Sequence, residues 1–232
     1  MPFFGFGFDP TFVLLIPAFI FAMWAQWKVQ NTYQKYSQVR ASNGRTGREM
    51  AAAILARNGL SDVPVEQAGG FLSDHYDPRT RSVHLSPHNY QTDSIAAIAV
   101  AAHEVGHAIQ HQQGYVPLNF RSTLFPVVNI GSWLAMPLFF IGLILGSAGG
   151  ILMDLGILFF LGVVLFQTVT LPVEFDASRR ALVQLTESGA ISTDEVGMAK
   201  KVLDAAALTY VAAAAVALLQ LVRLVLIRNS RD

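Results

Sequence analysis

The fold of this chain is decided by residues 124–173, LFPVVNIGSWLAMPLFFIGLILGSAGGILMDLGILFFLGVVLFQTVTLPV, in which Asp154 is the single charged residue. The run divides at the small residues 147–150 into two apolar halves. Each half is long enough to cross a bilayer, because about 20 apolar residues make a helical span. We therefore expect a helical hairpin with membrane spans at 124–146 and 151–173.

Two further apolar segments, 11–27 and 205–226, extend this pattern to about four transmembrane helices. The composition agrees, because 53% of the 232 residues are hydrophobic and 14% are charged, far from the balance of a soluble protein. A net charge of zero argues against a nucleic-acid partner, which would favour a basic face. The expected partner is the lipid bilayer. The absence of cysteine leaves imidazoles and carboxylates as ligands for any zinc ion.

The orientation follows from the lysines and arginines that come after the first span, since none comes before it. The positive-inside rule places these residues, and the segment that follows them, in the cytoplasm. A hairpin of spans then returns the chain to the same side. The fourth segment fits this rule less well, because Arg223, Arg228 and Arg231 would end outside. It is either a tolerated exception or a helix that lies on the membrane or is buried in protein. The basic residues after the first span are Lys28, Lys35, Arg40, Arg45 and Arg48.

A short motif between the first span and the hairpin carries the chemistry: His103-Glu104-Val105-Gly106-His107. Positions four apart lie on one face of a helix, so both imidazoles can bind one cation while Glu104 lies beside it. Residues 92–94, Thr-Asp-Ser, offer N-caps, and the alanine-rich run after them favours a helix. This helix is apolar almost all round, which indicates burial. Buried histidines and a glutamate need polar partners, and a metal ion supplies one. The alternative is a chance pentapeptide on a surface helix.

A catalytic zinc usually takes three protein ligands, so a third must come from elsewhere in the chain. His111 continues the stripe, but eight residues of helix place it ~12 Å from His103. An extended motif with histidine at position 113 is excluded, because that residue is Gln113. We prefer Glu174, in a short polar break directly after the second hairpin span, over a reading of it as a solvated residue at a helix start. Asp176 is the runner-up and could equally orient a ligand histidine through its ring N–H. The other candidates are His75, His84 and His88.

The remaining segments predict a small mixed portion. Residues 45–58 have a helical pattern that ends at Gly59, and residues 63–67 are extended. A proline in the turn at 77–80 and the alternation of Val83 and Leu85 after it suggest a β-hairpin. It would pair the runs 69–74 and 81–86. Towards the C-terminus we expect a helix at 174–186, and then a helix capped by Ser192 or Thr193 that continues into the fourth apolar segment.

The motif His103-Glu104-x-x-His107, followed after two spans by Glu174-Phe175-x-Ala177, resembles the membrane gluzincins. The chain as a whole resembles the bacterial "putative neutral zinc metallopeptidase" family of integral membrane proteins, and more distantly the HtpX-type membrane peptidases. The resemblance implies one zinc ion held by His103, His107 and Glu174, with Glu104 as the general base. Those distant relatives usually carry Asp four residues after the third ligand, where this chain has Ser178. The group that orients a ligand histidine is therefore left open between Asp176 and another residue.

The fold class expected is a mostly α membrane protein, with about four transmembrane helices and a small α+β zincin-like catalytic portion on the cytoplasmic side. We expect residues 1–232 to form a single membrane-embedded domain, with the catalytic portion at 45–120 and 174–204.

The expected function is a multi-pass membrane zinc endopeptidase that cleaves membrane or membrane-proximal proteins, for example in protein quality control. The alternative is a non-catalytic scaffold or assembly factor with structural zinc, and Glu104 argues against it because a structural site needs no general base. A transporter with a midplane metal site is disfavoured, because the motif helix is not one of the long spans. The donor to the oxyanion is left open between His111, Tyr115, Tyr210 and Arg180, and the oligomeric state is also open.

Overall fold

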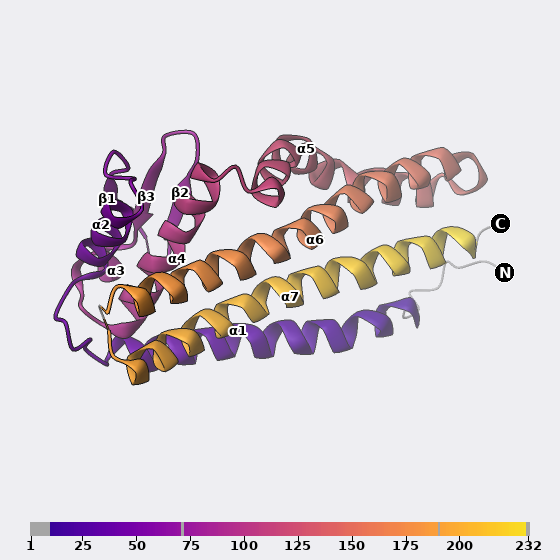
Figure 1. Ribbon diagram of the computed structural model, residues 1–232. Coiled ribbons are helices and arrows are strands. Elements are labelled where there is room, and N and C mark those ends of the chain that lie inside the picture. The colour runs from indigo at the N-terminus through magenta and orange to yellow at the C-terminus, as the bar shows by residue number, and fades with distance from the viewer. Residues whose placement is uncertain (1–9, 71, 190, 231–232) are drawn as a thin grey trace. The chain divides into compact units, whose positions relative to one another are not determined.

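The computed structural model describes residues 10–70, 72–189 and 191–230 (Figure 1). Helices predominate, and a three-stranded sheet accompanies them. The chain is therefore a mostly α membrane protein with a small α+β part, as the sequence predicts. The elements are η1 Pro10–Leu15, α1 Ile16–Ser37, α2 Gly47–Arg57, β1 Val65–Gln67, β2 His75–Asp77, β3 Ser82–Leu85, α3 Pro87–Gln91, α4 Ile95–Gln112, α5 Val116–Ile144, η2 Gly146–Gly149, α6 Gly150–Glu187 and α7 Thr193–Asn229.

Four helical segments are long and apolar enough to cross a membrane, and each overlaps one of the predicted spans; the second ends at Ile144, two residues before the predicted end at 146. The fourth segment, Thr193–Asn229, meets this criterion with the others. The helix expected at 174–186 is confirmed, and it is continuous with the second hairpin span, because α6 runs through Pro172 and Glu174 to Glu187. The polar residues of this stretch support the helix, since Asp176 pairs with arginines three and four positions later on the same helical face.

The contacts of the chain group it into two compact units. We call the first the apolar unit; it holds the described residues up to Trp24, Phe120–Thr170, and those from Tyr210 onward. The second, the polar unit, holds Ala25–Asn119 and Leu171–Thr209. Helices α1, α5, α6 and α7 each contribute residues to both units. The single domain over residues 1–232 stays a prediction.

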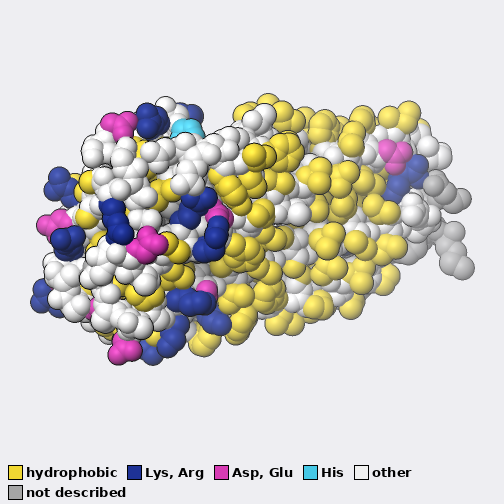
Figure 2. All heavy atoms as spheres, viewed as in Figure 1, with side chains coloured by type: hydrophobic (Ala, Val, Ile, Leu, Met, Phe, Trp, Pro, Cys, Tyr) yellow, Lys and Arg dark blue, Asp and Glu magenta, His cyan; other side chains and the backbone are white. Residues whose placement is uncertain are grey.

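Close helix packing holds the apolar unit together. A Cβ atom added to Gly142 of α5 would lie 2.6 Å from the carbonyl oxygen of Gly149, so only glycine permits this approach. Phe139, Met153 and Leu224 form a buried hydrophobic cluster in this unit. Other large side chains point outward, such as Trp133, which is 78% exposed. Hydrophobic side chains also cover most of the visible surface over these helices (Figure 2). Such a surface suits lipid rather than water.

Two arginines near the end of α7, Arg223 and Arg228, have local partners. The positive-inside rule does not favour arginines at this end of the fourth span. Arg228 Nε donates to Asp154 Oδ1 at 2.8 Å, so the one charged residue of the hairpin neutralises it. Arg223 donates to Thr11 Oγ1 at 3.2 Å and lies over the ring of Phe12. Arg231 lies outside the described residues. These contacts are consistent with a fourth span whose terminal charges are tolerated.

The sheet of the polar unit has the strand order β1-β3-β2. β2 pairs antiparallel with β3, which confirms the hairpin, and the extended segment at 63–67 supplies β1 as a parallel partner of β3. The first hairpin strand is His75–Asp77, so the run 69–74 that was expected to form it lies outside the strand. The stretch before it contains Gly70 and Leu72 with positive φ, a backbone that cannot pair as a strand; Phe71 lies outside the described residues.

The core of the polar unit forms around α4. Ser94 is its N-cap, as expected, with its hydroxyl accepting from the Ala97 amide at 3.2 Å. α2 begins at the expected place with a reciprocal capping box between Thr46 and Glu49. α4 packs against α2 and against strands β2 and β3. The helix that carries the motif is therefore buried by protein, as its apolar sequence predicts.

Candidate metal centre

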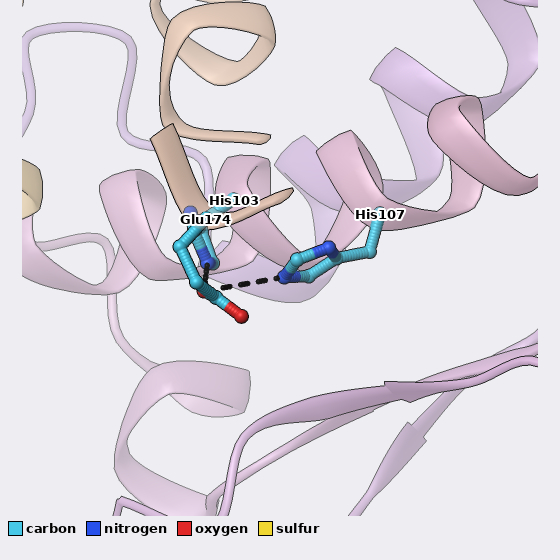
Figure 3. Close-up of side chains that lie close together, drawn as sticks. All are labelled: His103, His107 and Glu174. Carbon is cyan, nitrogen blue, oxygen red and sulfur yellow. Dashed lines mark hydrogen bonds and ion pairs between the residues drawn. The ribbon is translucent and has the colours of Figure 1, made fainter. Parts of the chain in front are cut away.

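Two histidines project from the same face of α4, one helical turn apart. Their ring centroids are 4.8 Å from each other, and His107 is 8% exposed. Glu174, which is 2% exposed, extends from α6 toward both rings (Figure 3). His103 Nε2 lies 3.3 Å and His107 Nε2 3.6 Å from Glu174 Oε2. The structure thus brings together three residues that are 71 positions apart at their widest.

The three side chains fit a zinc ion. Their ligand atoms all lie within 4.8 Å of one another, and no other such group of three was found in the described ranges. Bonds of 2.0–2.2 Å in a tetrahedral site place ligand atoms ~3.4 Å apart, close to the separations from Glu174 to the two rings. Two imidazoles and one carboxylate also form a common catalytic zinc set, which leaves a fourth position free.

Each histidine also makes a contact through its other ring nitrogen. His107 Nδ1 lies 3.0 Å from Oε1 of Gln110, and His103 Nδ1 lies 3.2 Å from Oγ of Ser178. Ser178 occupies the position where the distant relatives usually carry Asp, and it reaches the first histidine of the motif. Ser178 is therefore one of the residues that contact a histidine of the candidate site. The sequence had left this role open between Asp176 and another residue.

Asp176 lies outside the cluster of three ligands. Its carboxylate accepts from Arg179 and Arg180 on its own helix, and from Gln110 Nε2 at 2.9 Å. It therefore reaches a ligand histidine through Gln110 rather than directly. The runner-up for the third ligand is already engaged by three donors.

Glu104 is buried beside His103, with 8% of its surface exposed. In the described part of the chain its carboxylate accepts no hydrogen bond, so its oxygens are available to a reacting water. Burial raises the pKa of Glu104 above its ordinary value, and the nearby histidines oppose this shift. For His107, burial disfavours the imidazolium, but the hydrogen bond and charge of Glu174 outweigh it and raise the pKa. The surroundings of His107 therefore favour a positive charge next to the Glu174 carboxylate.

Comparison with known proteins agrees with this geometry. The model of a family described as "putative neutral zinc metallopeptidase" matches residues 11–229. The chain belongs to this family. It is 53% identical to a protein of Bacillus subtilis (strain 168) named "putative membrane protease YugP", over 220 residues that cover 94% of this chain and 97% of the relative. No solved structure matches the chain.

The other candidate residues of the chain have partners elsewhere. His75 and His84 stack on each other in the sheet, and His88 lies near the ring of Tyr33. His111 Nδ1 is 2.8 Å from the hydroxyl of Tyr76 on β2. None of these histidines belongs to the group of three ligands.

The candidate oxyanion donors are partly engaged as well. Arg180 bonds to Asp176 and to Gln113, and it lies over the ring of Tyr115. The Tyr115 hydroxyl donates to the carbonyl of Pro172 at 3.5 Å. Tyr210 belongs to the apolar unit. The choice of an oxyanion donor therefore stays open.

Sequence reasoning missed two contacts, those of Gln110 and Tyr76. Gln110 is fully buried, three residues after His107 on the same helix. An uncharged polar residue on that face of a buried helix could have signalled a partner for the histidine ring. Tyr76 had no comparable signal, because its contact joins a strand to a helix 35 residues away.

Gly106, between the two histidines, permits the close approach of α6. A Cβ atom at this position would lie 2.6 Å from the carbonyl oxygen of Ala177, which follows Glu174 by three residues. We predict that Gly106→Ala separates the helices at this point, destabilises the protein by about 1–3 kcal/mol as overpacking does, and weakens zinc binding. Thermal unfolding and zinc titration of the purified protein measure both effects.

Gly197→Ala is the matched control for this prediction, because Gly197 lies in α7 and a Cβ there meets nothing within 4 Å. Alanine in an exposed helix position should be neutral or slightly stabilising. Equal stability and zinc affinity in the two variants would show that the contact at Gly106 does not set the position of Glu174.

Proposed function

We propose that this protein is a gluzincin-type zinc endopeptidase that hydrolyses peptide bonds of membrane or membrane-proximal proteins. One zinc ion is held by His103, His107 and Glu174, and Glu104 is the general base. The observation that carries the proposal is the convergence of the three ligand atoms from two helices, with a buried carboxylate next to the first of them. The proposed cellular role is quality control of membrane proteins.

The residues have separate tasks in hydrolysis. When bound, zinc supplies Lewis-acid chemistry at the point where the three ligands meet. Glu104 takes a proton from the attacking water, whose oxygen forms the new bond to the carbonyl carbon. It then passes this proton to the nitrogen as the C–N bond breaks. Burial supports both steps, because it raises the pKa of Glu104 toward the working pH. A group whose pKa lies near the working pH can serve first as the base and then as the acid.

Two features of the structure support this substrate class. β2 is an edge strand that packs against α4, so an extended peptide could pair with its outer edge as an additional strand. The alternative for this edge is a purely structural hairpin. In addition, α1, α6 and α7 extend beyond the polar unit, and each belongs to a helical segment long enough to cross a membrane. Substrates of the site would therefore be peptides held near a bilayer.

Zinc removal tests this proposal. We expect about one zinc ion per purified chain and cleavage of casein or of an unfolded membrane protein. A chelator should abolish both, and added zinc should restore them. Cleavage that survives complete removal of metal would contradict the proposal. Zinc at full occupancy with no cleavage of any protein substrate would favour the scaffold with structural zinc.

We also propose that the site faces the cytoplasm, on the strength of the basic residues that follow the first span. The chain has no cysteine of its own, so single cysteines report position cleanly. Ser61→Cys and Ser188→Cys should react only with reagents that enter the cytoplasm, and Ser147→Cys should react from outside. Labelling of Ser61→Cys and Ser188→Cys from opposite sides would contradict the four-span topology.

A further inference from the structure

Gln110 is the most completely buried polar side chain near the three ligands. It has no exposed surface and lies one helical turn after His107 on α4. Its amide makes three contacts: Oε1 with His107 Nδ1 at 3.0 Å, and Nε2 with the Val173 carbonyl at 2.8 Å and with Asp176 Oδ2 at 2.9 Å. All three contacts are therefore with the candidate ligand histidine or with the helix that carries Glu174.

These contacts determine which way the amide faces. The Val173 carbonyl and the Asp176 carboxylate can only accept, so they require the NH₂ group of Gln110. The amide oxygen must then face His107, and the imidazole must donate from Nδ1. This tautomer leaves the lone pair of Nε2 free, on the side where Glu174 lies 3.6 Å away. The amide thus selects the form of His107 that can bind a metal ion.

The same amide also fixes the position of α6. Its two acceptors lie on either side of Glu174 in the sequence, one residue before it and two residues after it. Asp176 is itself held by Arg179 and Arg180, so the acceptor is not free to turn away. A single side chain on α4 therefore connects the second ligand to the helix that carries the third.

His103 has no equivalent arrangement. Its Nδ1 contacts the Ser178 hydroxyl at 3.2 Å, and a hydroxyl can either donate or accept. That contact does not select a tautomer.

We propose that Gln110 is a positioning residue, which holds His107 in its metal-binding tautomer and keeps Glu174 in register with α4. Its effect on zinc rests on the proposed function, whereas its effect on the tautomer does not. Loss of a partner that orients a metal-binding histidine typically weakens metal binding 10–100-fold. We expect a loss in this range when the amide is removed.

The test uses the full-length protein in detergent with the substitution Gln110→Leu, which keeps the size of the side chain and removes its polar groups. Gln112→Leu is the matched control, because Gln112 is an exposed residue of the same helix, and its one side-chain hydrogen bond among the described residues goes to the carbonyl of Asn58. Zinc affinity is measured by competition with a chelator. The expected results are a loss of 10–100-fold for Gln110→Leu and no change for Gln112→Leu.

A second measurement needs no metal. ¹⁵N NMR of the metal-free protein with labelled histidine should show His107 protonated on Nδ1 at a pH where the ring is neutral. In Gln110→Leu the Nε2–H form should appear. An unchanged tautomer together with unchanged zinc affinity would overturn the proposal. If the parent protein binds no zinc, the zinc endopeptidase fails as a function, while the tautomer still decides the role of Gln110.

A third comparison remains decisive if Gln110→Leu does not fold. Gln110→Glu keeps the acceptor for His107 but directs a carboxylate at Asp176, so zinc affinity should fall. Adding Asp176→Asn restores a donor and the original charge of the pair, and it should recover part of that affinity. Zinc affinity in Gln110→Glu equal to that of the parent would overturn the proposal, as would a double variant weaker than either single variant.

Discussion

Glu104→Gln should abolish proteolysis and leave zinc bound. The substitution keeps the size of the side chain but removes its ability to take up a proton, and general acid–base catalysis of this kind contributes about 10²–10⁴-fold to a rate. The metal should remain because Glu104 is not one of the three grouped ligands. Cleavage of casein and zinc content per chain, measured on the same preparation, provide the test.

Glu187→Gln serves as the matched control for this result. Glu187 ends α6 with its side chain 58% exposed, so its substitution should leave both cleavage and zinc unchanged. Normal turnover in Glu104→Gln would contradict the proposed mechanism. Loss of zinc from that variant would instead make Glu104 part of the metal site.

The sequence alone predicts the motif helix well, because local and global signals agree there. The cap at Ser94, the alanine-rich run and the four-residue spacing of the histidines all act within one helix. The membrane spans follow from length and apolarity in the same way. Features of this kind need no knowledge of which segments meet in space.

The features that the sequence did not predict depend on contacts between distant segments. The sequence did not indicate that the second hairpin span and the helix at 174–186 form one continuous helix, α6, in which Arg179 and Arg180 pair with Asp176 and support the helix. The role of Gln110 depends on a carbonyl 63 residues away. The partner of Arg228 is likewise 74 residues away. Neither periodicity nor charge counting contains such information.

The polar groups around the candidate site are arranged in two layers. The inner layer is the group of three ligands, and the outer layer consists of Gln110, Asp176 and Ser178. The outer groups restrict the rings and the carboxylate helix, while Gly106 allows that helix to approach. A variant in the inner layer should therefore have a larger effect on zinc than any variant in the outer layer.

Glu174→Ala should produce that larger effect. We expect a loss of zinc affinity greater than the ~10–100-fold expected of outer-layer variants. Proteolysis should be lost together with the zinc. The reason is that one of three candidate ligands disappears while the imidazoles of His103 and His107 remain. α6 should keep its place, because Ala177 still packs on Gly106 and Gln110 still bonds to Val173 and Asp176.

Circular dichroism and thermal unfolding of the Glu174→Ala protein test whether the fold is retained, and chelator competition measures the zinc affinity. Asp176→Ala is the matched variant on the same helix. It removes a carboxylate that the structure gives to Arg179, Arg180 and Gln110, so its loss of zinc should stay within the outer-layer range. Full zinc occupancy in Glu174→Ala, with zinc lost from Asp176→Ala, would transfer the third ligand to Asp176. In that case α6 would have to turn during metal binding, because the two carboxylates face different partners in this structure.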